Sequence, residues 1–268
     1  VKFVTLFRDA PLELELGGQL SPVRVAYSTY GQLSDTKDNV VLVCHALTGS
    51  SSVRSWWGDA LGDGLMLDTA TDFIICANVL GGCYGSSGPA SLNAVTNRNW
   101  GPEFPEVTIG DMIRVQVALL EKLGITRLKL AIGGSMGGMQ VLEWVRSSPQ
   151  MLEKAAIIAS PQAQTVWSRG FNVVARALIR EDPAWNGGHY LEQPRGMALA
   201  RMLGMLTYRS PESLQAEQAG PSKLSENQSA IESYLEYQGK KLLERFDAHC
   251  YLLMMNAMDS FDVPDEAL

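Results

Sequence analysis

Residues 128–144, LKLAIGGSMGGMQVLEW, constrain the fold more than any other segment of this chain. An apolar run of strand length leads into Gly133-Gly134-Ser135-Met136-Gly137, and an apolar run with helical spacing follows. A serine flanked by glycines at such a strand-to-helix corner is typical of a nucleophile elbow, because small neighbours avoid clashes and the hydroxyl projects from the sheet edge. We therefore interpret Ser135 as a nucleophile at the edge of a sheet.

Other short apolar runs, rich in β-branched residues, recur along the first 160 residues, at 22–31, 39–47, 72–80 and 154–160. Continuously apolar strands are buried on both faces, so these runs predict an α/β fold with a mostly parallel sheet between helices. The clearest helix is expected at 108–125, where Thr108 can cap the first turn, Asp111 suits that turn and Gly124 can end the helix.

The sequence pattern changes after Ser160, where strand-like runs stop and helical spacing takes over. We expect two domains: residues 1–163 as the first part of the sheet core, and residues 164–268 as a helical lid. Helices in the second region are predicted at 166–179, 197–208, 230–246 and 248–260. An inserted helical layer of this kind often shapes a substrate entrance, although simple helical packing explains the pattern equally well.

Charge and composition exclude several classes of protein. The 268 residues carry 22 Lys and Arg against 29 Asp and Glu, a net charge of −7, with no basic run for nucleic acid or anionic lipid. No apolar stretch is long enough to span a bilayer, and no signal-peptide pattern is present, so we expect a cytoplasmic protein. Four cysteines without close paired spacing indicate reduced thiols, with neither disulfides nor a metal site.

A serine nucleophile needs backbone donors for the oxyanion that forms on an attacked carbonyl, and a base for its own proton. The small, polar loop CHALTGSSS, residues 44–52, is placed to supply one donor. Leu47 and Met136 are therefore the predicted oxyanion-hole N–H donors. His45 lies before this loop, whereas this fold places its histidine after the nucleophile and the acid, so we interpret His45 as structural.

The partners of Ser135 are missing from the sequence pattern. His189 falls in a glycine-rich turn and His249 in a helical run, and neither follows a late strand. The aspartates late in the chain lie on or just after predicted helices, at positions 247, 259 and 262. The chain therefore shows a nucleophile without an evident triad acid or histidine.

Six ordered segments together resemble the homoserine O-acyltransferase family, whose members have the α/β-hydrolase fold. They cover most of the chain: CHALTGSSS, NVLGGCYGSSGP, GGSMGGMQVLEW, DPAWNGGHY, GMALARMLGMLTYRS and YLEYQGKKLLERFDA. The resemblance implies an α/β-hydrolase core with a helical lid insertion. Six motifs in one order are far more specific than the elbow alone.

The resemblance also implies an activity. Ser135 would take an acyl group from acyl-CoA, most simply acetyl-CoA, and pass it to the hydroxyl of L-homoserine in methionine biosynthesis, with no bound cofactor. Arg201 and Tyr208 match the family residues that bind the acceptor, and their spacing of seven places both on one helix face. Family members commonly form homodimers through the lid helices, so a homodimer is expected.

The chain departs from the family at its end. The residues MMNAMDSFDVPDEAL stop where the family returns to the sheet, so we expect the final strands, the triad Asp and the catalytic His to be absent. Roughly 80 to 110 residues would be missing, and the chain alone is predicted to be inactive. A succinyl-CoA donor, a serine acceptor, a serine esterase and a degenerate, purely binding hydrolase-fold module are the alternatives.

Overall fold

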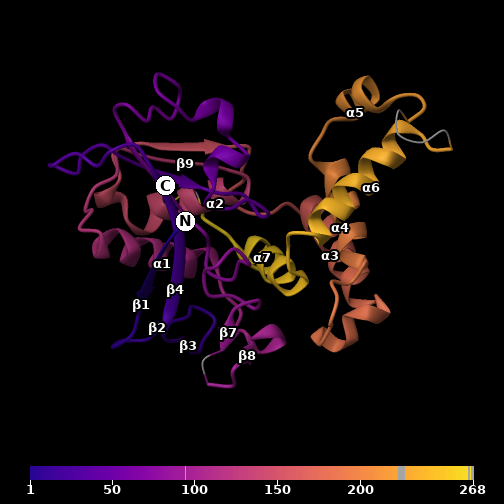
Figure 1. The fold of residues 1–268 in the computed structure, drawn as a ribbon, viewed down its shortest axis with the longest axis horizontal. Helices are drawn as coiled ribbons and strands as arrows, with labels where there is room; N and C mark the ends of the chain where they lie inside the picture. The colour runs from indigo at the N-terminus through magenta and orange to yellow at the C-terminus, as the bar shows by residue number, and fades with distance from the viewer. Residues whose placement is uncertain (94, 223–226, 265, 267–268) are drawn as a thin grey trace. The chain divides into compact units, whose positions relative to one another are not determined.

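The computed structural model describes residues 1–93, 95–222, 227–264 and 266 of the chain (Figure 1). It divides into two compact units. The first comprises Val1–Gln164 with Leu253–Leu268, and the second comprises Thr165–Leu252. The chain thus leaves the first unit once and returns to it after about ninety residues, so the second unit is an insertion in the first.

The first unit is built on a six-stranded sheet in the order β1-β4-β6-β5-β9-β10. The four strands β6, β5, β9 and β10 are parallel, whereas β4 pairs antiparallel with β6, and β1 pairs antiparallel with β4 at the edge. The strands are β1 (Lys2–Leu6), β4 (Val23–Tyr30), β5 (Val40–Cys44), β6 (Phe73–Ala77), β9 (Leu130–Gly134) and β10 (Ala155–Ile158). This is the mostly parallel α/β sheet that the apolar runs predict.

Two features of this sheet differ from the expectation. Strand β1 was not predicted, because its five residues are only partly buried and lack a continuous apolar run. Strand β10 was expected to be covered on both faces, but it lies at the sheet edge, where Ile157 and Ile158 are 40% and 43% exposed. The central strand β5, by contrast, is buried along its whole length, as predicted.

Helix α1 (Ile109–Lys122) begins and ends as predicted. The Thr108 hydroxyl accepts a hydrogen bond from Asp111 N, and the Asp111 carboxylate accepts one from Thr108 N at 2.9 Å. This reciprocal capping box satisfies two backbone donors that a helix start otherwise leaves unpaired. Gly124 follows the last turn at φ 67°, a conformation that glycine adopts without steric cost.

Short elements connect the main ones in the first unit. Two small antiparallel pairs are β2 (Leu12–Glu13) with β3 (Gln19–Leu20), and β7 (Leu92–Asn93) with β8 (Arg98–Asn99). Single turns of 3₁₀ helix are η1 (Val53–Ser55), η2 (Gly58–Ala60), η3 (Gly101–Glu103) and η4 (Pro149–Met151). Helix α2 (Met136–Ser147) starts directly after Ser135.

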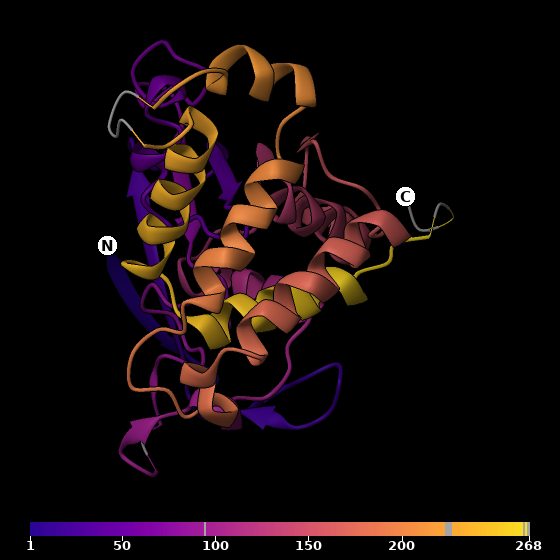
Figure 2. The same ribbon diagram turned by 90° about the vertical axis from the view of Figure 1, so that its right-hand side faces the viewer.

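The second unit is helical (Figure 2). Its elements are α3 (Val166–Arg180), η5 (Pro183–Gly188), α4 (Gly196–Thr207), α5 (Pro211–Gln218), α6 (Ala230–Leu243) and the first part of α7 (Ala248–Ser260). Helix α4 packs against both α3 and α6. The first crossing is close, because a β-carbon at Gly196 would overlap the carbonyl oxygen of Leu178.

Helix α5 was not predicted from the sequence. None of its residues is buried, so PESLQAEQ shows no apolar stripe from which a helix could be inferred. The helix is defined by its start instead. Ser210 caps it by accepting a hydrogen bond from Ser213 N, and Pro211 occupies the first helical position.

The expected second domain, residues 164–268, extends too far at its C-terminal side. Residues from Leu253 onward group with the first unit. The Asn256 amide donates to the Glu106 carboxylate, and Val263 N donates to the Gln162 carbonyl at 3.1 Å. Apolar packing adds to this, since the side chains of Leu253 and Met254 cover Gly81. The sequence pattern concealed the boundary because α7 continues through it.

Candidate active site

Ser135 occupies the corner between β9 and α2, and it is exposed. Its backbone lies at φ 56° and ψ −126°, a region that costs a residue with a side chain about 1–3 kcal/mol. Surrounding hydrogen bonds hold it there: Ser135 N donates to the Ile158 carbonyl at 3.0 Å, and its own carbonyl accepts from Gly138 N and Met139 N. This geometry is that of a nucleophile elbow.

Two glycines allow the elbow to approach β5. A β-carbon at Gly137 would overlap the carbonyl oxygen of Cys44, the last residue of β5. A β-carbon at Gly133 would overlap the carbonyl of Gly137 itself. Any side chain at either position would therefore push α2 away from the sheet, which explains why the elbow sequence needs glycine on both sides of its serine.

The predicted oxyanion donors lie on adjacent segments of the first unit. Strands β5 and β9 are parallel neighbours, with Cys44 opposite Gly133, so the loop after β5 and the start of α2 emerge at the same sheet edge. The backbone N–H groups of Leu47 and Met136 donate no hydrogen bond to any described residue. Both are therefore available to a ligand oxygen, and the N-terminus of α2 adds a favourable dipole for negative charge.

His45 is buried, with 3% of its surface exposed. Its Nδ1–H donates to the Ala46 carbonyl at 2.9 Å, and its Nε2 accepts from Val79 N at 3.2 Å. Burial lowers the pKa of His45 to about 4, so the ring is neutral at neutral pH. With both ring nitrogens bonded to backbone, His45 holds the loop after β5 and has no free nitrogen with which to accept a proton from Ser135.

The buried carboxylates of the first unit are already paired. Each is bonded to a basic side chain: Asp72 to Lys129, Asp111 to Arg114, and Glu143 to Arg146. The thiols of Cys44 and Cys76 are also buried, and burial raises the pKa of both. Within the described part of this unit, these groups therefore stabilise the core, and Ser135 at the elbow is an exposed candidate nucleophile.

The predicted acceptor-binding residues lie in the second unit and are brought together there. Arg201 is half-buried on α4, and its guanidinium carbon lies 5.4 Å from the ring centroid of Tyr208, the C-cap residue of the same helix. No carboxylate of the described residues pairs with Arg201. Its donors are therefore available for an anionic ligand, and a planar guanidinium can bind a carboxylate with two parallel hydrogen bonds.

Tyr251 is a third member of this cluster, which the sequence did not reveal. It lies on α7, is 2% exposed, and interacts electrostatically with Tyr208 and Arg201. Burial, reinforced by Tyr208, raises the pKa of Tyr251. A tyrosine in a run of buried apolar residues gives no signal beyond core packing, and only the fold places it beside Tyr208.

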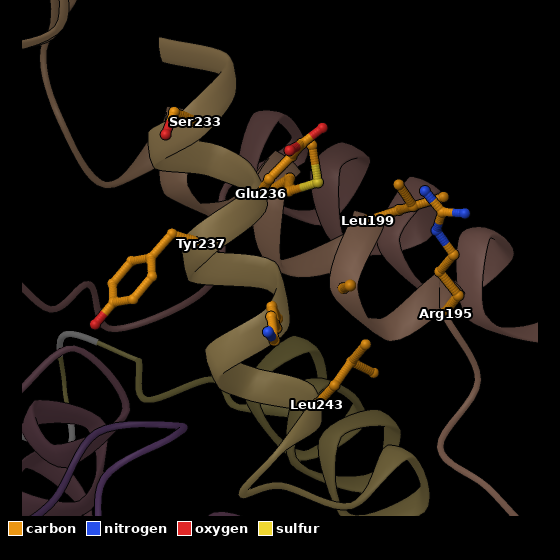
Figure 3. Close-up of a pocket in the computed structure, with 9 residues that line it drawn as sticks. Arg195, Leu199, Ser233, Glu236, Tyr237 and Leu243 are labelled. Atoms are coloured by element: carbon orange, nitrogen blue, oxygen red, sulfur yellow. The ribbon is translucent and has the colours of Figure 1, made fainter. Parts of the chain in front are cut away.

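A separate cavity of about 490 Å³ opens between α4 and α6 in the second unit (Figure 3). Arg195 and Leu199 line it from the side of α4, and Ser233, Glu236 and Tyr237 line it from α6. None of the residues predicted for the active site is among its lining residues. The cavity is therefore distinct from the Arg201 cluster, although it shares helix α4 with it.

Among the described residues, no group of three or more His, Cys, Asp or Glu side chains is arranged to hold a metal ion. No helix in the described part of the chain is long and apolar enough to cross a membrane.

The fold and the elbow define an α/β-hydrolase. The family model described as the alpha/beta hydrolase fold matches residues 39–259, most of the chain. Curated relatives narrow the class further: homoserine O-acetyltransferase of Chloroherpeton thalassium is 47% identical, with 94% of this chain and 68% of the relative covered. That of Haemophilus influenzae is 45% identical, with 98% and 77% covered. The chain belongs to the homoserine O-acetyltransferase family.

Solved structures agree with this assignment and add a second class. The homoserine O-acetyltransferase of Bacillus anthracis superposes with a TM-score of 0.87 at 26% identity, over 99% of this chain and 79% of that chain. Esterase E22 superposes with a TM-score of 0.84 at 27% identity, over 97% of this chain and 78% of that chain. Similarity of fold alone therefore does not separate acyl transfer to an amino acid from ester hydrolysis.

Proposed function

We propose that this enzyme transfers an acetyl group from acetyl-CoA to the side-chain hydroxyl of L-homoserine, a step of methionine biosynthesis, through an acetyl-Ser135 intermediate. The observation that carries the proposal is Ser135 itself, held at φ 56° beside two unengaged backbone donors, in a chain whose relatives are homoserine O-acetyltransferases. Acetyl-CoA acts as a co-substrate, and the reaction needs no bound cofactor or metal.

The proposed reaction consists of two half-reactions. In the first, Ser135 Oγ attacks the thioester carbonyl, the C–S bond breaks, and the serine proton leaves with the CoA thiol. In the second, the homoserine hydroxyl attacks the acetyl-serine carbonyl, and Ser135 recovers a proton as O-acetylhomoserine leaves. The N–H groups of Leu47 and Met136 stabilise the oxyanion in both halves. Both half-reactions need a general base. His45 does not provide it, because both of its ring nitrogens are hydrogen-bonded to the backbone.

Arg201 and Tyr208 are proposed to bind the acceptor. The support is that Arg201 has no described acidic partner and lies beside Tyr208, so the pair offers a cation and a hydroxyl to a carboxylate. Anchoring the amino acid at its carboxylate orients its side-chain hydroxyl, which is the group that must attack.

Intact-protein mass spectrometry after mixing the full-length enzyme, in place of this chain alone, with acetyl-CoA tests the nucleophile. We expect one acetyl group on Ser135, and we expect Ser135→Ala to remove it and to lower kcat by at least about 10⁴-fold. Homoserine should discharge the acetyl-enzyme and yield O-acetylhomoserine. An acetyl group on another residue, or no adduct with homoserine turnover intact, would contradict the assignment.

A serine esterase is the second candidate, favoured by the similarity to esterase E22. An esterase would acylate Ser135 from simple acetate esters and discharge it to water, with no gain in rate from homoserine. Comparing discharge of acetyl-Ser135 with and without homoserine separates the two activities. The same assay with succinyl-CoA or with serine identifies the donor and acceptor within the family, and an absence of any adduct would indicate a purely binding module.

We further propose a cytoplasmic homodimer that associates through the helices of the second unit. The support is a set of exposed apolar side chains on α4 and α6, namely Leu199, Leu206 and Tyr237, which are 39%, 43% and 55% exposed. Exposed apolar and aromatic side chains are typical of an association surface. Sedimentation velocity of the protein and of a Leu206→Glu, Tyr237→Glu double variant tests the dimer.

A further inference from the structure

A network of three buried polar side chains lies beneath the elbow, and none of them has a role in the reaction proposed above. Gln116 on α1 is 3% exposed, and Gln140 and Trp144 on α2 are both fully buried. Burying an amide costs free energy unless its donors and acceptors are paired. All three side chains are hydrogen-bonded, so together they form a complete polar network in the interior of the first unit.

The orientation of each amide in this network follows from its neighbours. The indole of Trp144 only donates, and it donates to Gln116 Oε1 at 2.8 Å. The amide nitrogen of Gln116 must then point the other way, and it donates to Gln140 Oε1 at 2.8 Å. This leaves the amide nitrogen of Gln140 directed at backbone carbonyls, which only accept. The indole donor at one end and the backbone carbonyls at the other therefore fix how both glutamines are turned.

The amide nitrogen of Gln140 bridges the two segments that carry the proposed oxyanion donors. It donates to the carbonyl of His45 at 3.0 Å and to the carbonyl of Met136 at 3.3 Å. The first carbonyl lies two residues before Leu47. The second belongs to Met136 itself. A single side chain thus connects the loop after β5 to the first turn of α2.

From this geometry we infer that Gln140 is a positioning residue for the oxyanion hole, which sets the separation of the Leu47 and Met136 N–H groups. Two donors stabilise a developing oxyanion only when both lie about 2.7–3.1 Å from it. A displacement near 1 Å can cost on the order of 10²-fold in rate. Gln140 contacts no substrate in this scheme and acts through the two backbone segments. The inference rests on the proposed function of Ser135.

The test compares two variants of the full-length enzyme that remove hydrogen bonds from the same network. Gln140→Met keeps the unbranched shape but removes both bridging hydrogen bonds. Gln116→Met is the matched control, because it breaks the network behind Gln140 and leaves the bridging amide nitrogen in place. Single-turnover acetylation of Ser135 is measured by rapid-quench mass spectrometry, together with steady-state KM values and urea unfolding.

We expect Gln140→Met to slow acetylation of Ser135 by about 10- to 100-fold, with KM for both substrates within about twofold of the parent enzyme. Gln116→Met should keep the acetylation rate within about threefold while losing comparable stability, since each variant leaves buried polar groups unpaired. An unchanged rate in Gln140→Met would overturn the inference. Equal rate losses in the two variants would do the same, because they would indicate general destabilisation.

Two additions keep the outcome decisive. If Gln140→Met does not fold, Gln140→Asn replaces it: the shorter side chain keeps an amide but cannot reach both carbonyls, so acetylation should slow by about threefold or more, and an unchanged rate contradicts the inference. A chromogenic acetate ester is used beside acetyl-CoA, because its attack needs the oxyanion donors but neither CoA nor homoserine. If the ester acetylates Ser135 and acetyl-CoA does not, the proposed function is refuted. The role of Gln140 can then still be tested from the rate of acetylation by the ester.

Discussion

The two units hold their candidate residues in different ways. In the first, helix α2 buries nine consecutive residues from Met136 to Trp144, and Ser135 is positioned by backbone hydrogen bonds and by glycine contacts. In the second, the fifteen residues of α3 include two buried ones, Ala175 and Ile179, and α5 has none. There the candidate residues Arg201 and Tyr208 are positioned by side-chain contacts on a partly exposed helix.

This difference predicts how each unit responds to substitution. A buried, close-packed segment transmits a small change in volume to its neighbours, because there is no free space to absorb it. A helix with few buried residues depends more on caps and intrinsic propensity, as at Thr165, Ser210 and Ser229, whose side chains each cap a helix. Substitutions in the first unit should therefore alter catalysis and stability together, whereas those in the second should separate the two.

The largest effect is expected at the elbow. Gly137→Ala would bring a methyl group into the Cys44 carbonyl, so we expect about 3 kcal/mol or more of destabilisation and loss of Ser135 acetylation. Urea unfolding and the mass adduct measure both. Gly134→Ala is the matched control, since its methyl group would meet only ordinary contacts near Ile158. Equal behaviour of the two variants would show that close packing at the elbow is not what holds Ser135.

Arg201 should give a binding effect with little change in stability. Arg201→Ala removes charge-assisted hydrogen bonds of about 1.5–3 kcal/mol, so KM for homoserine should rise by about 10- to 100-fold while KM for acetyl-CoA stays within about twofold. Steady-state kinetics measure this. Arg209→Ala is the control, because Arg209 is bonded to Ser213 and Glu217 on α5. A rise in both KM values, or a fall in kcat alone, would not fit acceptor binding.

The buried ring of His45 should make the first unit sensitive to acid. Its pKa is near 4 in the folded protein and near 6.5 when exposed, so the unfolded state takes up the proton first as pH falls below 6.5. Stability should therefore fall by about 2 kcal/mol between pH 7 and pH 5 through this group alone. Urea unfolding across that range should show a shallower fall in His45→Gln. His189→Gln, at an exposed position, should leave the slope as it is, and a parent slope retained in His45→Gln would refute this role.

The smallest effect is expected in α3. Gly170 has open space around its α-carbon and an ordinary helical conformation, so Gly170→Ala should stabilise the second unit by about 0.5–1 kcal/mol without altering kinetics. Urea unfolding measures the gain. Destabilisation by Gly170→Ala would mean that this face of α3 is covered in solution. The helix would then be more closely packed than its few buried residues indicate, and the two units would differ less.

Local patterns predicted much of the fold because they act over a few residues. Periodicity marked strands β5, β6 and β9, and the Thr108 cap marked the start of α1. Strand β1 and helix α5 were not predicted, because neither buries a continuous apolar face. The boundary at Leu253 was not predicted, because it depends on contacts with Glu106 and Gln162, which are far away in the sequence.

The candidate site divides in the same way. Ser135 could be recognised because an elbow leaves a local signature of glycines between a strand and a helix. Gln140 and Tyr251 could not, because a polar residue in an apolar helix has no visible purpose until its partners are known. Those partners, the His45 carbonyl and the Tyr208 side chain, lie 95 and 43 residues away in the chain.

The point where the chain leaves and re-enters the first unit has a consequence for how such enzymes diversify. Gln162 and Val263 are joined by a backbone hydrogen bond of 3.1 Å, and Ala163 bridges Asp262, so the two first-unit segments that flank the insertion, before Thr165 and after Leu252, meet side by side. A helical module attached through two adjacent ends can be exchanged, lengthened or replaced without re-threading the sheet. Exchanging the segment between Gln162 and Val263, which holds the second unit and the first-unit part of α7, should therefore give the proposed nucleophile a new set of acceptors. A chimaera joined at these two residues tests this.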